Sequence, residues 1–153
     1  MSTNDRFDEF FKLLMFLEGG ESNHSNDRGG HTKFGITQKL YDKHRDKYKK
    51  PHASVAGLTT GGARLVYREE FYKPVEYCDN IERHYNYFDM CVNSGYRNYK
   101  KMQIENPADI YKYRKDFFSK IAENDSSQKV FLRGWLNRLD VIKTYFETGL
   151  KIV

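Results

Sequence analysis

The chain has 153 residues, 39% hydrophobic and 16% aromatic, so it can bury enough apolar surface to fold and has the usual size of one domain. It contains no run of eighteen apolar residues, which excludes a transmembrane span, and its polar, acidic start MSTNDRFDEF lacks the pattern of a signal peptide. A net charge of +5 suits an anionic partner, such as nucleic acid, anionic lipid or an anionic cell envelope. Because the lysines are scattered and no recognition motif is visible, we expect no nucleic-acid binding.

The first predicted element is an amphipathic helix from about residue 4 to residue 18. Its apolar residues follow the i, i+3, i+4, i+7 pattern of a buried face: Phe7, Phe10, Phe11, Leu14 and Leu17. The pair Gly19-Gly20 is expected to end it. From Gly19 to Gly35 the chain is rich in Gly, Asn, Ser and Asp, which predicts loops around a small β-hairpin, with Thr32 to Ile36 as one short strand.

Five further helices are predicted from capping and breaking residues. Their expected ranges are 37–48, 59–73, 84–94, 107–123 and 126–146, with Thr37, Thr59 or Thr60, and Asn106 as N-terminal caps and Gly95 as a terminator. We see no internal repeat and no long linker. The sequence therefore predicts one mostly α domain over residues 1–153, with a small N-terminal β-hairpin region, an N-terminal half of about 1–75 and a C-terminal helical half of about 84–153.

Glu18 is the strongest candidate for a catalytic residue. It lies four positions after Leu14 and seven after Phe11, so it projects from the apolar stripe in the final turn of its helix. Partial desolvation and the negative end of the helix dipole both disfavour ionisation there, which would raise the pKa of the carboxyl as a general acid requires. The alternative is that Glu18 only forms a salt bridge or faces water at a helix end.

The sequence around Glu18 carries a longer pattern of acid, loop, second acid, glycine turn, hydroxyl and strand. The stretch FLEGGESNHSNDRGGHTKFGIT closely resembles the signature of glycoside hydrolase family 108, a family of phage and bacterial muramidases. FDMCVNSG and FLRGWLNRL resemble the peptidoglycan-associated C-terminal part of that family. The resemblance implies an α+β, lysozyme-like fold, cleavage between N-acetylmuramic acid and N-acetylglucosamine, and Glu18 as the catalytic glutamate.

Two residues after Glu18 complete a looser likeness to short phage lysozymes that use a Glu, an Asp and a Thr. Asp27 and Thr32 have the same order and nearly the same spacing. Glycosidic cleavage needs a protonated acid at the leaving oxygen and a carboxylate that stabilises the cationic centre or activates water; a hydroxyl can hold that water. Asp27 has an alternative role, because Asn26-Asp27-Arg28-Gly29 is also good turn chemistry.

Weaker candidates lie in the C-terminal half. Asn93 and Ser94 could hydrogen-bond an N-acetyl group or a sugar hydroxyl, or equally cap a helix before Gly95, and Gln103 is a further candidate sugar contact. The cysteines, Cys78 and Cys91, are too few for a disulfide framework and are expected to be thiols. The five histidines show no ligand spacing, so we expect no metal and no cofactor.

Three functions are compatible with these patterns. The first is a hydrolytic muramidase of the phage endolysin kind, a monomer that acts on bacterial peptidoglycan during host lysis. With no signal peptide, it would be made in the host cytoplasm, would not insert stably into a membrane and would need a holin to reach the wall. The second is a lytic transglycosylase that uses Glu18 alone. The third is a non-catalytic peptidoglycan-binding protein.

Overall fold

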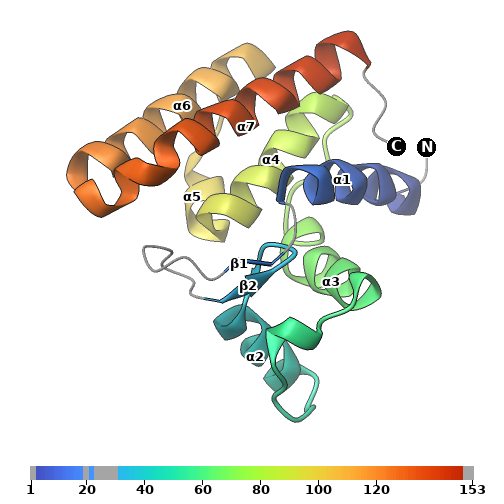
Figure 1. The fold of residues 1–153 in the computed structure, drawn as a ribbon. Coiled ribbons are helices and arrows are strands. Elements are labelled where there is room, and N and C mark those ends of the chain that lie inside the picture. Colours follow the sequence, from blue (N-terminus) through green and yellow to red (C-terminus); the bar gives the residue numbers. More distant parts are fainter. Residues whose placement is uncertain (1–2, 19–20, 23–30, 150–153) are drawn as a thin grey trace. The chain divides into compact units, whose positions relative to one another are not determined.

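A computed structural model describes residues 3–18, 21–22 and 31–149 (Figure 1). Most of these residues are helical and one small antiparallel sheet accompanies the helices, which confirms the mostly α fold class. The chain divides into two compact units, Met1–Lys73 and Pro74–Val153, which we call the N-terminal and C-terminal units. Among the described helices, none combines the length and the apolar character that crossing a membrane requires.

In its described part, the N-terminal unit contains three α-helices and a three-stranded sheet of order β1-β2-β3. In chain order its elements are α1 (Thr3–Glu18), β1 (Glu21–Ser22), β2 (Thr32–Lys33), β3 (Ile36–Thr37), α2 (Gln38–Lys47), the short 3₁₀ helix η1 (Val55–Gly57), α3 (Thr60–Tyr67) and the π-helix η2 (Arg68–Tyr72). Thr37 and Thr59 cap α2 and α3 through their side chains, as predicted.

The apolar face of α1 packs on α3 and η2 through aromatic rings. Phe7 and Phe10 approach the ring of Tyr72, with centroids 5.0 and 6.1 Å apart, and Phe11 approaches Tyr67 at 6.2 Å. The i→i+5 geometry of η2 brings residues five positions apart toward one face, so Tyr67 and Tyr72 both reach α1. This packing holds the first part of α1 against α3 and η2.

The prediction of one strand from Thr32 to Ile36 is wrong. The segment forms two strands, β2 and β3, in which Lys33 pairs with Ile36 and the two residues between them form the turn. Phe34 and Gly35 both have positive φ, 53° and 78°, which is the pattern of a two-residue type I′ hairpin. The alternating residues favour a strand, but the reversed backbone at these two positions turns the chain back on itself.

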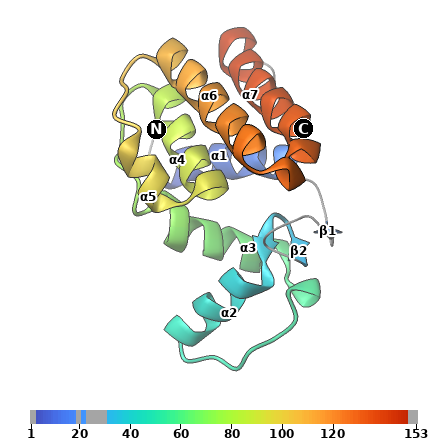
Figure 2. The ribbon, with the colours of Figure 1, turned by 90° about the vertical axis from the view of Figure 1, so that its left-hand side faces the viewer.

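The C-terminal unit is all helical in its described part. It contains α4 (Ile81–Ser94), α5 (Tyr96–Lys101), α6 (Pro107–Asn124), the 3₁₀ helix η3 (Ser126–Gln128) and α7 (Lys129–Thr148). Helices α6 and α7 lie side by side, joined by η3 (Figures 1 and 2). Asn106 caps α6 and Gly95, with φ 87°, ends α4, as predicted. Helix α4 begins three residues earlier than expected, because Asn80 caps it, and α5 was not predicted.

A buried charge cluster ties three helices of the C-terminal unit together. The fully buried Asp89 of α4 accepts a hydrogen bond from Nη2 of Arg114 (α6) at 2.6 Å, and from Nε and Nη2 of Arg138 (α7) at 3.1 and 2.8 Å. Burial by itself would raise the pKa of the Asp89 carboxyl, but Arg138 and Arg114 outweigh it and hold that pKa well below its ordinary value. The carboxylate therefore stays charged and links α4, α6 and α7.

Candidate active site around Glu18

Glu18 is the last residue of α1 and is half-buried. At the C-terminal end of a helix the backbone carbonyls present partial negative charge, which disfavours a second negative charge nearby. Earlier apolar residues of the same helix, up to Leu14, are buried, and Phe11 packs against Tyr67 of α3.

The Glu18 carboxyl lies directly against the turn between β2 and β3. A Cβ atom placed on Gly35 would be only 2.6 Å from Glu18 Oε2 and 2.7 Å from Glu18 Cδ, well inside any normal contact distance. Position 35 also has φ 78°, which L side chains rarely adopt. Glycine is therefore favoured by the backbone at this position, and any larger residue would displace the Glu18 carboxyl.

Tyr67 contributes the second group beside the acid. Its hydroxyl donates a hydrogen bond to the carbonyl oxygen of Phe34, which holds the β2–β3 turn against α3. The same hydroxyl would be 2.6 Å from a Cβ on Gly35. Two atoms that are each 2.6 Å from one point cannot be more than twice that distance apart, so the Tyr67 hydroxyl and Glu18 Oε2 lie close together. The ring itself is buried, with 1% exposure.

Of the other two predicted catalytic residues, the structure describes Thr32 but not Asp27. Thr32 is buried in β2, where it pairs with Ser22 of β1 and Thr37 of β3. It is thus in the strand that leads into the turn beside Glu18. Asp27 lies in residues 23–30, outside the described part of the chain. The catalytic roles of these two residues stay predictions.

The three predicted sugar-binding residues all lie in the C-terminal unit. Asn93 is exposed, and its Nδ2 donates to Asp89 Oδ2 at 3.1 Å. The Ser94 hydroxyl is buried and has no hydrogen-bond partner among the described residues. Gln103 Nε2 donates to the carbonyl oxygen of Lys100, 2.6 Å away at the end of α5. Asn93 and Gln103 thus have structural partners already, and sugar contacts by all three stay predictions.

No group of three or more His, Cys, Asp or Glu side chains in the described ranges is arranged to hold a metal ion. Cys78 and Cys91 are buried and not disulfide-bonded, as predicted. Burial raises the pKa of the Cys91 thiol to about 12, so this thiol is not a nucleophile at neutral pH.

Sequence reasoning missed Gly35 and Tyr67. Gly35 stands inside a run that was interpreted as a strand, although an isolated glycine in such a run often marks a close backbone approach. The spacing of Tyr67 with Ala63 and Val66 predicts only that its ring faces the core, and the ring is buried. The position of its hydroxyl depends on a contact with Phe34, 33 residues away in sequence.

Comparison with known proteins identifies a family and a shared fold. The pattern of the family described as Glycosyl hydrolase 108 matches residues 11–95, more than half of the 153 residues, and this range includes Glu18, Gly35 and Tyr67. A solved structure described as that of Brucella abortus SagA has a TM-score of 0.66 at 16% sequence identity over 95% of each chain, which shows a shared fold. No curated protein matches this chain.

Proposed function

The chain belongs to the glycosyl hydrolase 108 family, whose activity is peptidoglycan hydrolysis, and on this premise we propose that it is a muramidase. Its substrate bond in this proposal is the β-1,4 linkage from N-acetylmuramic acid to N-acetylglucosamine. The observation that carries the proposal is the placement of the Glu18 carboxyl against Gly35 and beside the Tyr67 hydroxyl. A catalytic proton donor must be held in one position, and the close contact of Glu18 with the glycine turn suits that requirement.

In the proposed reaction Glu18 is the proton donor. Its carboxyl proton passes to the glycosidic oxygen as the bond from that oxygen to C1 of the muramic acid breaks, and the sugar that leaves carries the proton as a hydroxyl. The helix end and the partial burial of Glu18 support this role, because both disfavour the ionised form. Gly35 and Tyr67 act as positioning residues for the carboxyl.

A second group must then deliver water to C1. We assign this role to Asp27, which would stabilise the oxocarbenium-like centre or take the proton of the attacking water, and to Thr32, whose hydroxyl would hold that water. In the same proposal Asn93, Ser94 and Gln103 hydrogen-bond N-acetyl groups or sugar hydroxyls. The pattern of Glu18, Asp27 and Thr32 along the chain supports hydrolysis over a mechanism that uses one acid alone.

The biological role that we propose is that of a phage endolysin, a monomer that is made in the host cytoplasm and degrades the host wall during lysis. A holin would give it access to the wall. The net charge of +5 supports attraction to an anionic envelope.

Mass spectrometry of purified sacculi after digestion tests the proposed bond and the proposed reaction together. A hydrolytic muramidase leaves a reducing N-acetylmuramic acid end that has gained one water. A lytic transglycosylase would leave a 1,6-anhydro sugar at that end, lighter by one water. A protein that only binds peptidoglycan would release no fragment. Reducing N-acetylglucosamine ends would show that the enzyme cuts the other glycosidic bond of the strand.

A further inference from the structure

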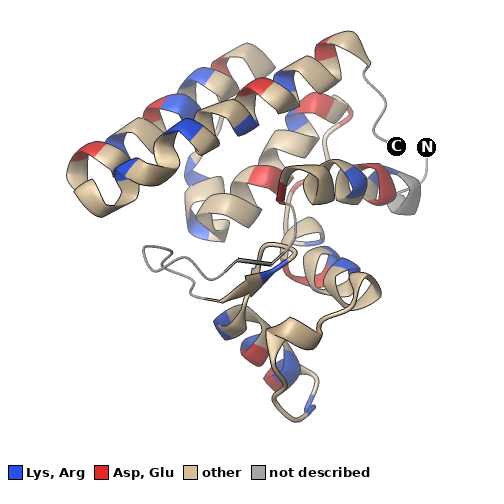
Figure 3. Ribbon diagram, in the orientation of Figure 1, with Lys and Arg blue, Asp and Glu red and all other residues tan. Residues whose placement is uncertain are grey.

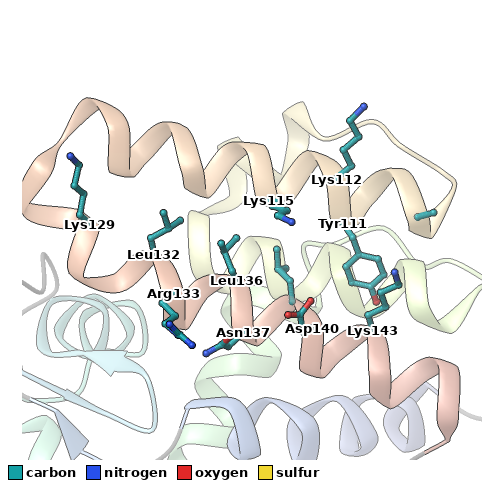
Figure 4. Close-up of a pocket in the computed structure, with 12 residues that line it drawn as sticks. Tyr111, Lys112, Lys115, Lys129, Leu132, Arg133, Leu136, Asn137, Asp140 and Lys143 are labelled. Carbon is teal, nitrogen blue, oxygen red and sulfur yellow. The ribbon is translucent and has the colours of Figure 1, made fainter.

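The C-terminal unit carries a groove of about 830 Å³ between α6 and α7 (Figure 4). Its lining comes from one face of each helix, with residues 108, 111, 112 and 115 of α6 and residues 129, 132, 133, 136, 137, 139, 140 and 143 of α7. Both helices lie beyond residues 11–95, the range that the family pattern matches, although α7 carries the stretch FLRGWLNRL that resembles the C-terminal part of that family.

The rim of the groove is strongly cationic. Five of the lining residues are basic and one, Asp140, is acidic; the basic residues are Lys112, Lys115, Lys129, Arg133 and Lys143. Figure 3 shows Lys and Arg recurring along both helices. The residues that line the groove thus carry a net charge of +4, from five basic residues and one acidic residue.

Most of these cations form no ion pair with an acid in the described part of the chain. Within the part of the chain that the structure describes, only Lys143 among them forms an ion pair, with Glu147 at 3.9 Å. All five basic side chains are exposed. Unpaired cations on both sides of one groove favour an anionic occupant, because its charge would replace contacts with water by contacts with fixed positive charges.

The interior of the groove is apolar. Leu132 and Leu136 are half-buried and project from α7 toward α6, opposite Lys115 (Figure 4), and Leu139 is buried. The three leucines lie at i, i+4 and i+7 and so form one row along α7. A fully polar polyanion would leave the exposed parts of Leu132 and Leu136 uncovered, whereas a molecule with both an anionic head and an apolar chain would cover them.

We propose that the α6–α7 groove binds an anionic lipid. The acyl chain lies along the leucine row, and the phosphate of the headgroup lies beside Lys115, with Lys112 about one turn away along α6. The long aliphatic stems of the lysines can cover the chain while their ammonium groups reach the phosphate. Such a site would hold the enzyme at an anionic membrane surface independently of its action on the wall.

Sedimentation with vesicles tests the proposal without any cell wall, so its outcome does not depend on the proposed muramidase activity. The full chain is mixed with vesicles of phosphatidylcholine alone or with phosphatidylglycerol added. We expect binding only to the second kind. A cation near an anionic surface contributes roughly fivefold to affinity, so Lys112→Gln with Lys115→Gln should weaken binding about 25-fold.

A matched control is available in α5 of the same unit. Lys100 and Lys101 are exposed and do not line the groove, so Lys100→Gln with Lys101→Gln makes the same charge change elsewhere. This variant should keep most of the binding. Equal losses in the two double variants would overturn the proposal, because attraction would then depend on overall charge alone.

A substitution in the leucine row distinguishes binding of a lipid from binding of a soluble polyanion. Leu132→Gln keeps the charge and should weaken vesicle binding several-fold, with the melting temperature confirming that the variant is folded. Inorganic polyphosphate should compete poorly with phosphatidylglycerol vesicles. If Leu132→Gln binds like the wild type, or if polyphosphate displaces the protein at equal phosphate concentration, the groove takes a polyanion and the lipid assignment is wrong.

Discussion

Gly35→Ala adds only one methyl group, but it should reduce the catalytic rate strongly. The added Cβ would lie 2.6 Å from Glu18 Oε2 and 2.6 Å from the Tyr67 hydroxyl, whereas ordinary contacts begin near 3.4 Å. The carboxyl, or the turn itself, must therefore move by about 0.8 Å. A misplacement of about 1 Å at a reacting group can reduce the rate roughly 100-fold, or about 2.7 kcal/mol of transition-state stabilisation.

The same substitution should also destabilise the fold modestly. With φ 78° at position 35, alanine would occupy a left-handed conformation that costs about 1–2 kcal/mol. Gly35→Asn separates this strain from the clash, because asparagine tolerates positive φ but still carries a Cβ. We expect Gly35→Asn to recover part of the lost stability and little of the lost activity.

Gly61→Ala is the matched control in the same unit. Position 61 lies in α3, and nothing lies within 4 Å of a Cβ added there. Alanine favours the helix, so this variant should keep its activity and hold or raise its melting temperature. Initial rates on purified sacculi and thermal melts measure both quantities for all three variants. Wild-type rates for Gly35→Ala and Gly35→Asn would refute the idea that the glycine turn positions Glu18.

Three further predictions concern the C-terminal unit and the proposed second carboxylate. Asp89→Asn should lower the free energy of unfolding by about 3–5 kcal/mol in denaturant melts, since it leaves the buried Arg114 and the largely buried Arg138 without their counter-charge. Because the folded-state pKa of Asp89 is lowered, its contribution is complete above about pH 4 and is lost as the pH falls further, so the gap between wild type and variant should narrow below pH 4. Trp135→Ala should cost about 2–3 kcal/mol with little change in activity, because the half-buried ring stacks on Phe118 at 5.1 Å; an unchanged melting temperature with lost activity would instead indicate contact with substrate. Asp27→Asn should reduce turnover by orders of magnitude with little effect on substrate binding, whereas near-normal turnover would make Asp27 a turn residue.

Local signals predicted the helical framework well. The apolar spacing of α1, the Thr37 and Asn106 caps and the Gly95 terminator all act within a few residues, so they can be recognised in the sequence alone. Helix α5 escaped prediction because YRNYKK carries almost no apolar periodicity, and of its residues only Tyr99 is buried.

The arrangement around Glu18 could be predicted only in part. Its place at the end of an apolar stripe marked the acid as a candidate, and the resemblance to a family gave it a role. The turn at Phe34 and Gly35 is held by the Tyr67 hydroxyl, which comes from α3. A contact between residues so far apart in sequence cannot be predicted from a local pattern. The Asp89 cluster is similar, since Arg138 reaches Asp89 across 49 positions of sequence.

The activity of Glu18→Gln tests the central claim most directly. Glutamine keeps the size and shape of the side chain against Gly35 but has no acidic proton to give. General acid catalysis typically contributes about 10²- to 10⁴-fold, so release of reducing ends from purified sacculi should fall by at least about 10²-fold. The melting temperature should stay close to that of the wild type. A folded Glu18→Gln variant that degrades sacculi at the wild-type rate would contradict the assignment of Glu18 as the proton donor.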